Sequence, residues 1–441
     1  MKKLLAISII LLLAFSLHSE VQFSGSITSE FSLGLPYTDR AFKANSGSLA
    51  FDFDLSFYKE NLSLVSASTL TLDGVKDASR DNSYFFSDFK RAYLSIKELY
   101  LDYYQDKFSL RFGRQLVSFG AADSLTVTNI LCPEDMTKLA GDELSDKRLG
   151  IDALKLSYSA GDSIVDLYYI PFFTRTAMPL EDGNPIRSVL FPSSVALGGG
   201  ENARVSSFTS DDIESPSLSF SSAEYALRFR RYLSKADFSL YGFYGYENTP
   251  LISYKLTGSS PNYILKLDGE YSRTLMLGAD TSIPVGSKTV RLEAAYFPFR
   301  PFQTSARSQL TGFSSRYRER GEFAILAGLD YLGPTWTVTG QYYLSYILGD
   351  VEALDREVFD NKATISVSRS LGGDEFEVSL SAILGLNYLD TAINPKIKYR
   401  FNDDIVFTLS ALIMNTGTDK GKGYGRFREL SSLAFKCVYS Y

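Results

Sequence analysis

Residues 427–441 at the C-terminal end of the chain read FRELSSLAFKCVYSY. Apolar side chains recur at every second position, and the positions between them are mostly polar. A period of two predicts a β-strand with one apolar face and one polar face. This strand fits a soluble β-sandwich as well as a membrane β-barrel, in which Lys436 would face water and Cys437 would face lipid. The alternating apolar residues are Leu433, Phe435, Cys437, Tyr439 and Tyr441.

The chain after residue 20 repeats this alternation in long stretches, such as residues 336–348 and 376–388. Strands of soluble proteins have about five or six residues, whereas strands that span a membrane need about nine to eleven. The lengths therefore favour a transmembrane β-barrel. Residues 427–441, which end on an aromatic residue, are similar to the closing strand of outer-membrane barrels. We expect them to pair antiparallel with residues 21–35.

Short polar turns alternate with longer connections along the chain, and this alternation predicts the topology. Two strands lie between consecutive turns, and one strand lies outside each end of the series. We predict an all-β fold: a transmembrane antiparallel up-and-down β-barrel of about 18 strands, with short periplasmic turns and long outer loops. Sixteen strands result if residues 362–369 and 393–401 are not strands. The turns, which are rich in hairpin-forming residues, lie at residues 59–61, 105–106, 160–161, 234–235, 284–286, 333–334, 372–373 and 402–404.

Residues 1–19 have the organisation of a secretory signal peptide. Lys2 and Lys3 precede the apolar run 4–17, which is too short to span a membrane as a helix. No later apolar run reaches 18 residues, so strands would form any membrane-spanning part. We expect one barrel domain over residues 20–441, integral to the outer membrane of a diderm bacterium. Its partners would be outer-membrane lipid and, through the C-terminal strand, the barrel-assembly machinery; the sequence does not indicate an oligomeric state.

The composition excludes several classes of function. His18 is the single histidine of the chain and lies in the signal region, so a Ser-His-Asp triad and a His-based zinc site are excluded. Two cysteines, Cys132 and Cys437, are too few for a disulfide framework. A formal net charge of −6 gives no support for nucleic-acid binding. We therefore expect no enzymatic activity, no cofactor and no metal.

The polar face of the strands is the expected lining of a water-filled lumen. Acidic and basic side chains lie on separate strands of this face, which resembles the transverse field of a porin constriction. The pattern also fits a solvated interior in which charges pair across the lumen and select no substrate. The candidate pore-lining residues are Asp52, Asp54, Arg111, Gln115, Asp166, Arg228, Arg230, Arg291, Glu293, Glu377, Lys396, Lys398 and Arg400.

Two long connections are expected to have a role, because loops beyond about 15 residues are usually functional or disordered. The connection 172–222 contains several Phe and Pro residues and three consecutive glycines at 198–200. It either folds inward and narrows the pore or stays at the surface. The connection 119–149 follows a strand that ends near Gln115. We expect both connections to set the size limit of a channel.

A local motif lies within residues 110–139. The tripeptide GRQ at 113–115 ends a strand, FG follows at 119–120, and Asp and Pro residues come after it. This motif resembles a family of large, mostly uncharacterised Gram-negative outer-membrane barrels, in which Asn is usual at the place of Cys132. The resemblance implies a barrel similar to export and uptake porins, including the alginate-export type. Three loop residues of the motif either brace the wall or contact a substrate: Asp123, Pro133 and Asp135.

We predict a porin-like channel for the passive diffusion of small hydrophilic or anionic solutes, because Arg and Lys residues on the lumen face attract anions. Two alternatives stay open. A transporter of long-chain fatty acids or other hydrophobic substrates needs an occluded, partly apolar lumen, which inward Tyr241, Phe243, Tyr343 and Ile347 would fit. A surface adhesin or structural barrel needs a sealed lumen and ordered outer loops.

Overall fold

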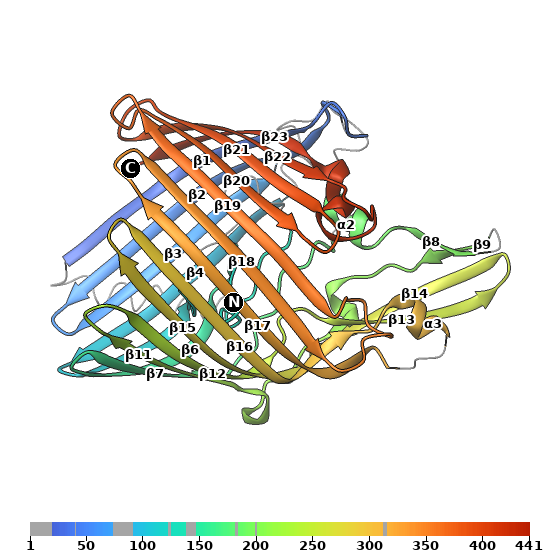
Figure 1. Cartoon of the computed structure of the whole chain (residues 1–441), viewed down its shortest axis with the longest axis horizontal. Helices are drawn as coiled ribbons and strands as arrows, with labels where there is room; N and C mark the ends of the chain where they lie inside the picture. The colour runs from blue at the N-terminus through green and yellow to red at the C-terminus, as the bar shows by residue number, and fades with distance from the viewer. Residues whose placement is uncertain are drawn as a thin grey trace.

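The computed structural model describes residues 20–39, 41–73, 91–121, 125–137, 147–180, 184–198, 201–311 and 315–441. These residues form a closed antiparallel β-barrel of 18 strands (Figure 1), as the sequence predicts. The predicted signal peptide lies outside the described residues. The first nine barrel strands are β1 (Glu20–Gly34), β2 (Ala44–Lys59), β3 (Leu62–Asp73), β4 (Arg91–Gln105), β5 (Phe108–Gln115), β6 (Ile151–Ala160), β7 (Ser163–Ile170), β11 (Glu224–Tyr232) and β12 (Asp237–Tyr246). The other nine are β15 (Arg273–Val285), β16 (Lys288–Gln303), β17 (Tyr317–Leu332), β18 (Trp336–Leu348), β19 (Phe359–Leu371), β20 (Phe376–Gly385), β21 (Asp390–Arg400), β22 (Ile405–Asn415) and β23 (Ser432–Ser440).

The barrel closes where its first strand meets its last. β1 and β23 pair antiparallel, with Glu30 opposite Lys436, so the predicted partner of the C-terminal strand is confirmed. Phe435, the next residue towards the outer loops, is 48% exposed and lies on the other face of the sheet. The prediction that this strand begins at residue 427 is wrong. Residues Gly423–Leu430 form the 3-10 helix η3, and the strand begins at Ser432.

All eight predicted short turns join neighbouring barrel strands. Glu60, Asp106, Gly161 and Gly286 in these turns have φ between 50° and 61°. This is the left-handed region that the tightest hairpins require, which explains why these connections need so few residues. The two stretches that decide between 18 and 16 strands are present as β19 and β21, so the larger number is correct.

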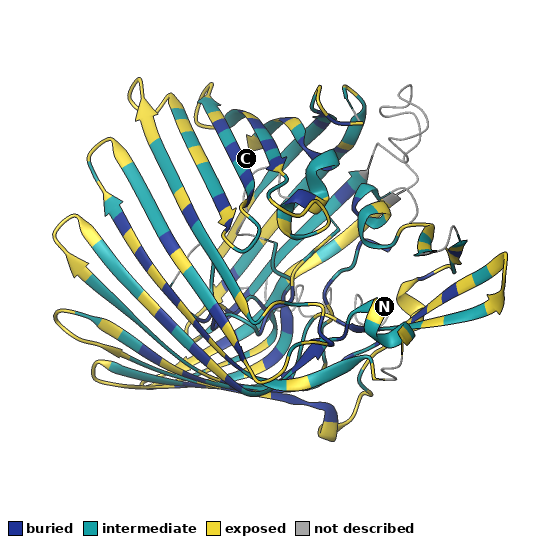
Figure 2. Cartoon of the chain, turned by 45° about the vertical axis from the view of Figure 1, so that its right-hand side comes forward, coloured by how far each residue is buried: buried dark blue, intermediate teal, exposed yellow. Residues whose placement is uncertain are grey.

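Large apolar side chains that are about half exposed recur at every second position around the outside of the barrel. Examples from well-separated strands are Leu240, Leu329, Leu380 and Phe435, with exposed fractions of 49%, 49%, 46% and 48%. Figure 2 shows the alternation of exposed and buried positions along the strands. A closed barrel with an apolar outer belt is the architecture of integral outer-membrane proteins, and we assign the chain to the outer membrane on this ground. Within the described ranges, no helix is long and apolar enough to cross a membrane.

A second sheet of five strands lies at the end of the barrel that carries the long loops (Figure 1). Its strand β14 pairs antiparallel with β13 and parallel with β9 and β10. Phe208, Ile213, Ile252 and Leu267 form an apolar core beside it. The connection 172–222 therefore contributes three short strands, β8, β9 and β10, to this outer sheet. The elements outside the barrel are β8 (Ser194–Gly198), β9 (Glu201–Val205), β10 (Ile213–Glu214), β13 (Leu251–Ser259), β14 (Asn262–Glu270), the short helices α2 (Pro185–Leu190) and α3 (Ala306–Thr311), and the 3-10 turns η1 (Ser210–Asp212) and η2 (Phe220–Ser222).

Candidate functional site

The connection after β5 enters the barrel as the inner segment, defined here as residues 116–121 and 125–133. The backbone N–H of Gly120 donates to the hydroxyl of Tyr241 on β12 over 3.1 Å. The backbone N–H of Leu125 donates to the side-chain oxygen of Gln341 on β18 over 3.0 Å. The inner segment therefore follows the inner surface from β5 to the opposite side of the barrel.

The end of β5 is shaped to begin this inward course. Gly113 has a φ of +128°, and a Cβ at this position would lie 2.3 Å from the carbonyl oxygen of Leu99 on β4, so only glycine fits. Gln115 is 1% exposed and donates to the carbonyl oxygens of Gly113 and Ala153. Its prediction as a pore-lining residue is wrong, because the wall itself uses its amide group.

The inner segment packs an apolar side against the barrel wall. Phe119 is 1% exposed, and its ring lies 4.6 Å from the ring of Tyr241 and 5.9 Å from the ring of Tyr168. Val127 and Leu131 of the same segment are also buried. The inner face of this part of the wall is therefore a packed core and is not open to water. The wall contributes Ile151, Ala153, Tyr168, Ile170, Ala226, Tyr241, Phe243, Met276, Ala295, Phe297, Ala324 and Leu326.

Polar bonds fix the far end of the inner segment to β16. One carboxylate oxygen of Glu293 accepts from the hydroxyl of Thr126 over 3.1 Å, from the N–H of Val127 over 3.1 Å and from the hydroxyl of Thr128 over 3.3 Å. Gly120 has a φ of +91°, and a Cβ there would lie 2.5 Å from the other carboxylate oxygen of Glu293. Glu293 is 3% exposed, so it anchors this segment and is closed off from the lumen.

The last part of the inner segment is held by local bonds. The sulfur of Cys132, which is 3% exposed, accepts the N–H of Val117 over 3.2 Å. Burial raises the pKa of this thiol to about 11. The carbonyl oxygen of Pro133 accepts from the N–H of Leu149, and Asp135 accepts from the backbone and hydroxyl of Thr137. These two motif residues brace the loop, and Asp123 lies outside the described residues.

Three cations surround one carboxylate on the wall between the inner segment and the short turns. Lys155 on β6, Arg228 on β11 and Arg230 on β11 lie 3.6, 2.8 and 3.3 Å from the carboxylate of Asp166 on β7. Ser157 also donates to Asp166 over 2.5 Å. Asp166 is fully buried, whereas the three cationic side chains keep 20%, 12% and 28% of their surface exposed. We call Lys155, Asp166, Arg228 and Arg230 the cationic cluster.

Balanced ion pairs lie on both sides of the cationic cluster. Arg111 holds Asp102 through two bonds of 2.7 Å and stacks on the ring of Tyr100. On the other side, Arg291 lies 2.6 Å from Asp330 and also donates to the carbonyl of Ala121 in the inner segment. Each pair is neutral, whereas the cationic cluster contains three cations and one carboxylate. Two further carboxylates lie on the same stretch of wall: Asp280 on β15 accepts from Tyr241, and Glu293 on β16 accepts from the inner segment.

The opposite wall holds the remaining predicted residues. Asp52 accepts from Ser26 over 2.8 Å and from Thr69 over 2.6 Å. Glu377 lies directly opposite Lys398 in the pairing of β20 and β21. On this wall the inward positions between the charged residues are mostly Ser and Thr. Asp54 and Arg400 are exposed, and Lys396 is 9% exposed.

Comparison with known proteins places the chain in a family. A family model described as "Protein of unknown function (DUF1302)" matches residues 21–412. The chain belongs to the DUF1302 family. No curated protein sequence matches it.

Solved structures support the barrel fold of this DUF1302 chain. It is similar to OccAB1 of Acinetobacter baumannii, with 6% identity over 97% of this chain and 96% of that one, and a TM-score of 0.52. It is also similar to OccK5 (OpdH) of Pseudomonas aeruginosa, with 8% identity over 96% and 97% of the two chains, and a TM-score of 0.50. At these identities the likeness concerns the fold, which is that of outer-membrane porin structures.

The DUF1302 chain brings some predicted residues together and separates others. Asp166, Arg228 and Arg230 meet in the cationic cluster, whereas Arg111 and Arg291 belong to pairs beside it. The sequence reasoning missed Lys155, which completes the cluster. Its signal was present, because Lys155 alternates in phase with inward Ala153 and Ser157, and it lies directly opposite Arg111.

Proposed function

We propose that the chain is an outer-membrane channel for the passive diffusion of small hydrophilic solutes, with a preference for anions. The observation that carries this proposal is the cationic cluster. Lys155, Arg228 and Arg230 share the single carboxylate of Asp166, which leaves two positive charges without a carboxylate inside the cluster. An uneven set of charges on a lumen wall attracts ions of the opposite sign.

A hydrogen-bond donor in the cluster supports the same conclusion. The Nε of Arg230 is buried and has no hydrogen-bond partner among the described residues. A buried donor without a partner is unfavourable, so the arrangement around Asp166 is not that of a fully satisfied structural ion pair. An anion that passes the cluster can accept charge-assisted bonds from the parts of the three cationic side chains that stay exposed.

The inner segment supplies the size limit in this proposal. It lies on the inner surface from β5 to β18, directly beside the cationic cluster, and Arg228 donates to the carbonyl of Ser118 over 3.0 Å. Solutes that pass the segment therefore pass the cluster as well. In this proposal the inner segment narrows the lumen, and the cationic cluster supplies positive charge beside the narrowed part.

Planar lipid bilayers test the proposal. In a KCl gradient, the reversal potential of the wild-type protein is expected to show a preference for Cl⁻. Exchanging Lys155→Gln and Arg230→Gln together leaves the neutral pair of Arg228 and Asp166, and the preference should fall several-fold. Lys59→Gln with Lys235→Gln, two exposed turn residues, removes the same charge elsewhere and should leave it unchanged. A wild-type protein without stepwise conductance, or with a preference for K⁺, would contradict the proposal.

The alternative of a hydrophobic-substrate transporter rests on inward apolar side chains, and their packing speaks against it. Tyr241, Phe243 and Ile347 are 6%, 2% and 0% exposed. Phe119 covers the first of these, and Phe302 and Leu354 cluster with the last. These side chains stabilise loops inside the barrel and offer no apolar path. Liposome swelling with small sugars separates the two functions, because sugars should pass through the proposed channel.

A further inference from the structure

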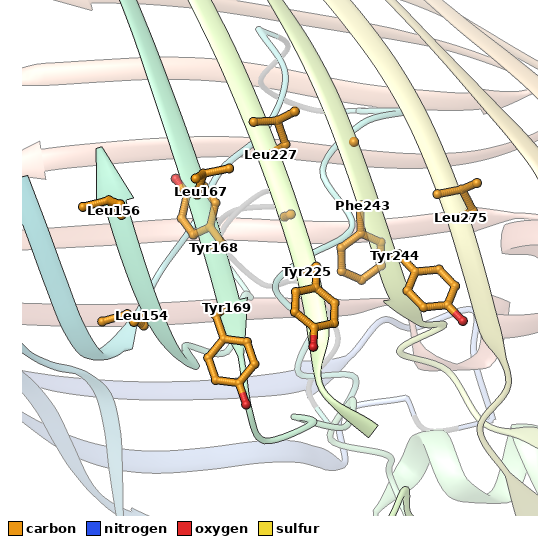
Figure 3. Close-up of a pocket in the computed structure, with 12 residues that line it drawn as sticks. Leu154, Leu156, Leu167, Tyr168, Tyr169, Tyr225, Leu227, Phe243, Tyr244 and Leu275 are labelled. Atoms are coloured by element: carbon orange, nitrogen blue, oxygen red, sulfur yellow. The ribbon is translucent and has the colours of Figure 1, made fainter. Parts of the chain in front are cut away.

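An apolar groove crosses the outer, lipid-facing surface of the barrel (Figure 3). It extends over β6, β7, β11, β12 and β15 and has a volume of about 480 Å³. Gly242 on β12 lines the groove, and a Cβ at this position would meet nothing within 4 Å. Leu227 and Leu277, directly opposite Gly242 on the two neighbouring strands, are 44% and 50% exposed. The groove is therefore a gap in the apolar belt where one side chain is missing.

Three tyrosines lie along the groove on the side of the outer loops. Tyr225 is directly opposite Tyr169 on β7 and Tyr244 on β12, and Figure 3 shows the three rings in one row. Tyrosine is typical of the level where lipid chains meet lipid headgroups, because its ring is apolar and its hydroxyl is polar. The groove thus leads from the apolar belt up to the headgroup level of the outer leaflet.

Arg273 stands one step beyond this row, on the same outer face. It lies opposite Tyr246, and its guanidinium is 4.9 Å from the ring centre of Tyr244 and 4.3 Å from that of Tyr246. It donates to the carbonyl oxygens of Ser221 and Ala223 through three bonds. A guanidinium has five N–H donors, so donors are left over. Within the described part of the chain, no carboxylate forms a salt bridge with Arg273.

The segment that holds Arg273 adds exposed apolar side chains next to it. Leu218 and Phe220, which precede the acceptor Ser221, are 80% and 86% exposed. Large apolar side chains with this exposure are unfavourable in water and favourable at the surface of a bilayer. One continuous surface therefore contains the groove, the row of three tyrosines, the guanidinium of Arg273 and the exposed apolar residues Leu218 and Phe220.

We propose that this surface binds one lipid of the outer leaflet that carries a phosphorylated headgroup. An acyl chain fills the groove at Gly242, and the phosphate accepts the remaining donors of Arg273. Guanidinium groups bind phosphate through two parallel bonds, which gives specificity as well as affinity. A lipid is the occupant that the position favours, because the groove is continuous with a face that already contacts the bilayer.

Binding of defined lipids to the purified protein in detergent tests this proposal by native mass spectrometry. The probes are diphosphorylated lipid A and the same lipid without its phosphates. Arg273→Gln removes the cation, and Arg231→Gln is its control, since Arg231 is an exposed residue on the outer face of β11 at the opposite end. Gly242→Leu fills the groove, and Gly340→Leu is its control, because an added Cβ there meets only the oxygen of Thr364 at 3.9 Å.

The wild-type protein should bind diphosphorylated lipid A at least about tenfold more tightly than the dephosphorylated form, as expected for a charge-assisted contact. Arg273→Gln should abolish this preference, and Gly242→Leu should weaken the binding of both lipids about tenfold, with both controls like wild type. Equal affinity of the wild type for the two lipids would overturn the proposal. So would a Gly242→Leu variant that binds lipid as the wild type does but loses self-association, because a second copy of the chain would then be the occupant.

Discussion

Two halves of the barrel wall share the same outer face and differ on the inner one. On β17, Ala324 and Leu326 point inward and are 3% and 1% exposed, within the core that the inner segment completes. On β20, the inward residues Ser379 and Ser381 are polar and only partly buried. The inward side chains of a strand are therefore apolar where the inner segment packs on them and polar where they face the lumen. Where the inner segment covers the wall, both faces of a strand are apolar and the alternation of polarity disappears.

The largest loss of stability is expected when the Phe119 ring, which packs the inner segment against the wall, is removed. Phe119→Ala should lower the free energy of unfolding by about 3–5 kcal/mol, because a fully buried ring leaves a cavity. Urea unfolding of the refolded barrel in lipid vesicles measures it. A loss below about 1 kcal/mol would mean that the inner segment is not packed as a core.

A pH-dependent effect is expected at Cys132 in the covered half. The folded pKa of about 11 exceeds the ordinary value of 9.0, so the folded state retains the proton more strongly. The stabilising contribution of the protonated thiol to the free energy of unfolding is fully present below pH 9 and is lost as the pH rises through 11. Relative to Cys132→Ala, the wild-type protein should lose about 2–3 kcal/mol over this window. Unfolding curves with a constant difference between pH 8 and 11 would show that the thiol is not buried in the folded protein.

A smaller loss of stability is expected when one of the hydrogen bonds that anchor the inner segment is removed. Thr128→Val keeps the shape of a fully buried side chain and removes its bond to Glu293. The loss should be about 1 kcal/mol, since Glu293 keeps its bonds to Thr126 and Val127. Thermal unfolding of the two proteins measures the difference. A variant as stable as the wild type would indicate that water replaces the hydroxyl, and thus that the covered half is wet.

The smallest effect is expected on the uncovered half. Ser366→Ala removes the bond of 2.9 Å between the hydroxyls of Ser366 and Ser381. Water in the lumen can take the place of the lost partner, so stability should change by less than about 0.5 kcal/mol. The same urea titration as for Phe119→Ala measures it. A loss as large as that of the Phe variant would remove the distinction between the two halves.

The outer face and the topology were predictable because every barrel strand has one face in contact with lipid, which requires apolar side chains at every second position. The C-terminal strand and β20 alternate clearly, since one face meets lipid and the other meets water. Short turns gave the topology but not always the register: Gln105 and Phe108 close the hairpin of β4 and β5, which places Asp102 opposite Arg111. A two-residue turn at 105–106 would have placed Ser109 opposite Asp102 instead.

The course of the inner segment was not predictable, because its residues show no periodic pattern. The one available signal was the apolar inward pair Tyr241 and Phe243, which from the sequence fitted the alternative of a hydrophobic-substrate transporter. In the structure Tyr241 is the packing partner of Phe119. The contact of Arg228 with Asp166 was hidden for another reason: its strands are joined by the long connection 172–222, whose length does not fix their register.

The seam between β1 and β23 has a consequence for how the barrel is made. It joins residues from opposite ends of the chain, such as Ser26 and Ser440, so its contact order is as high as this chain permits, and closure is expected to be slow. Until β23 is in place, β1 and β22 both present unpaired edges on a sheet with an apolar surface, which invites aggregation. A chain that stops before Ser432 should therefore remain an open, aggregation-prone sheet even though its other hairpins can all form.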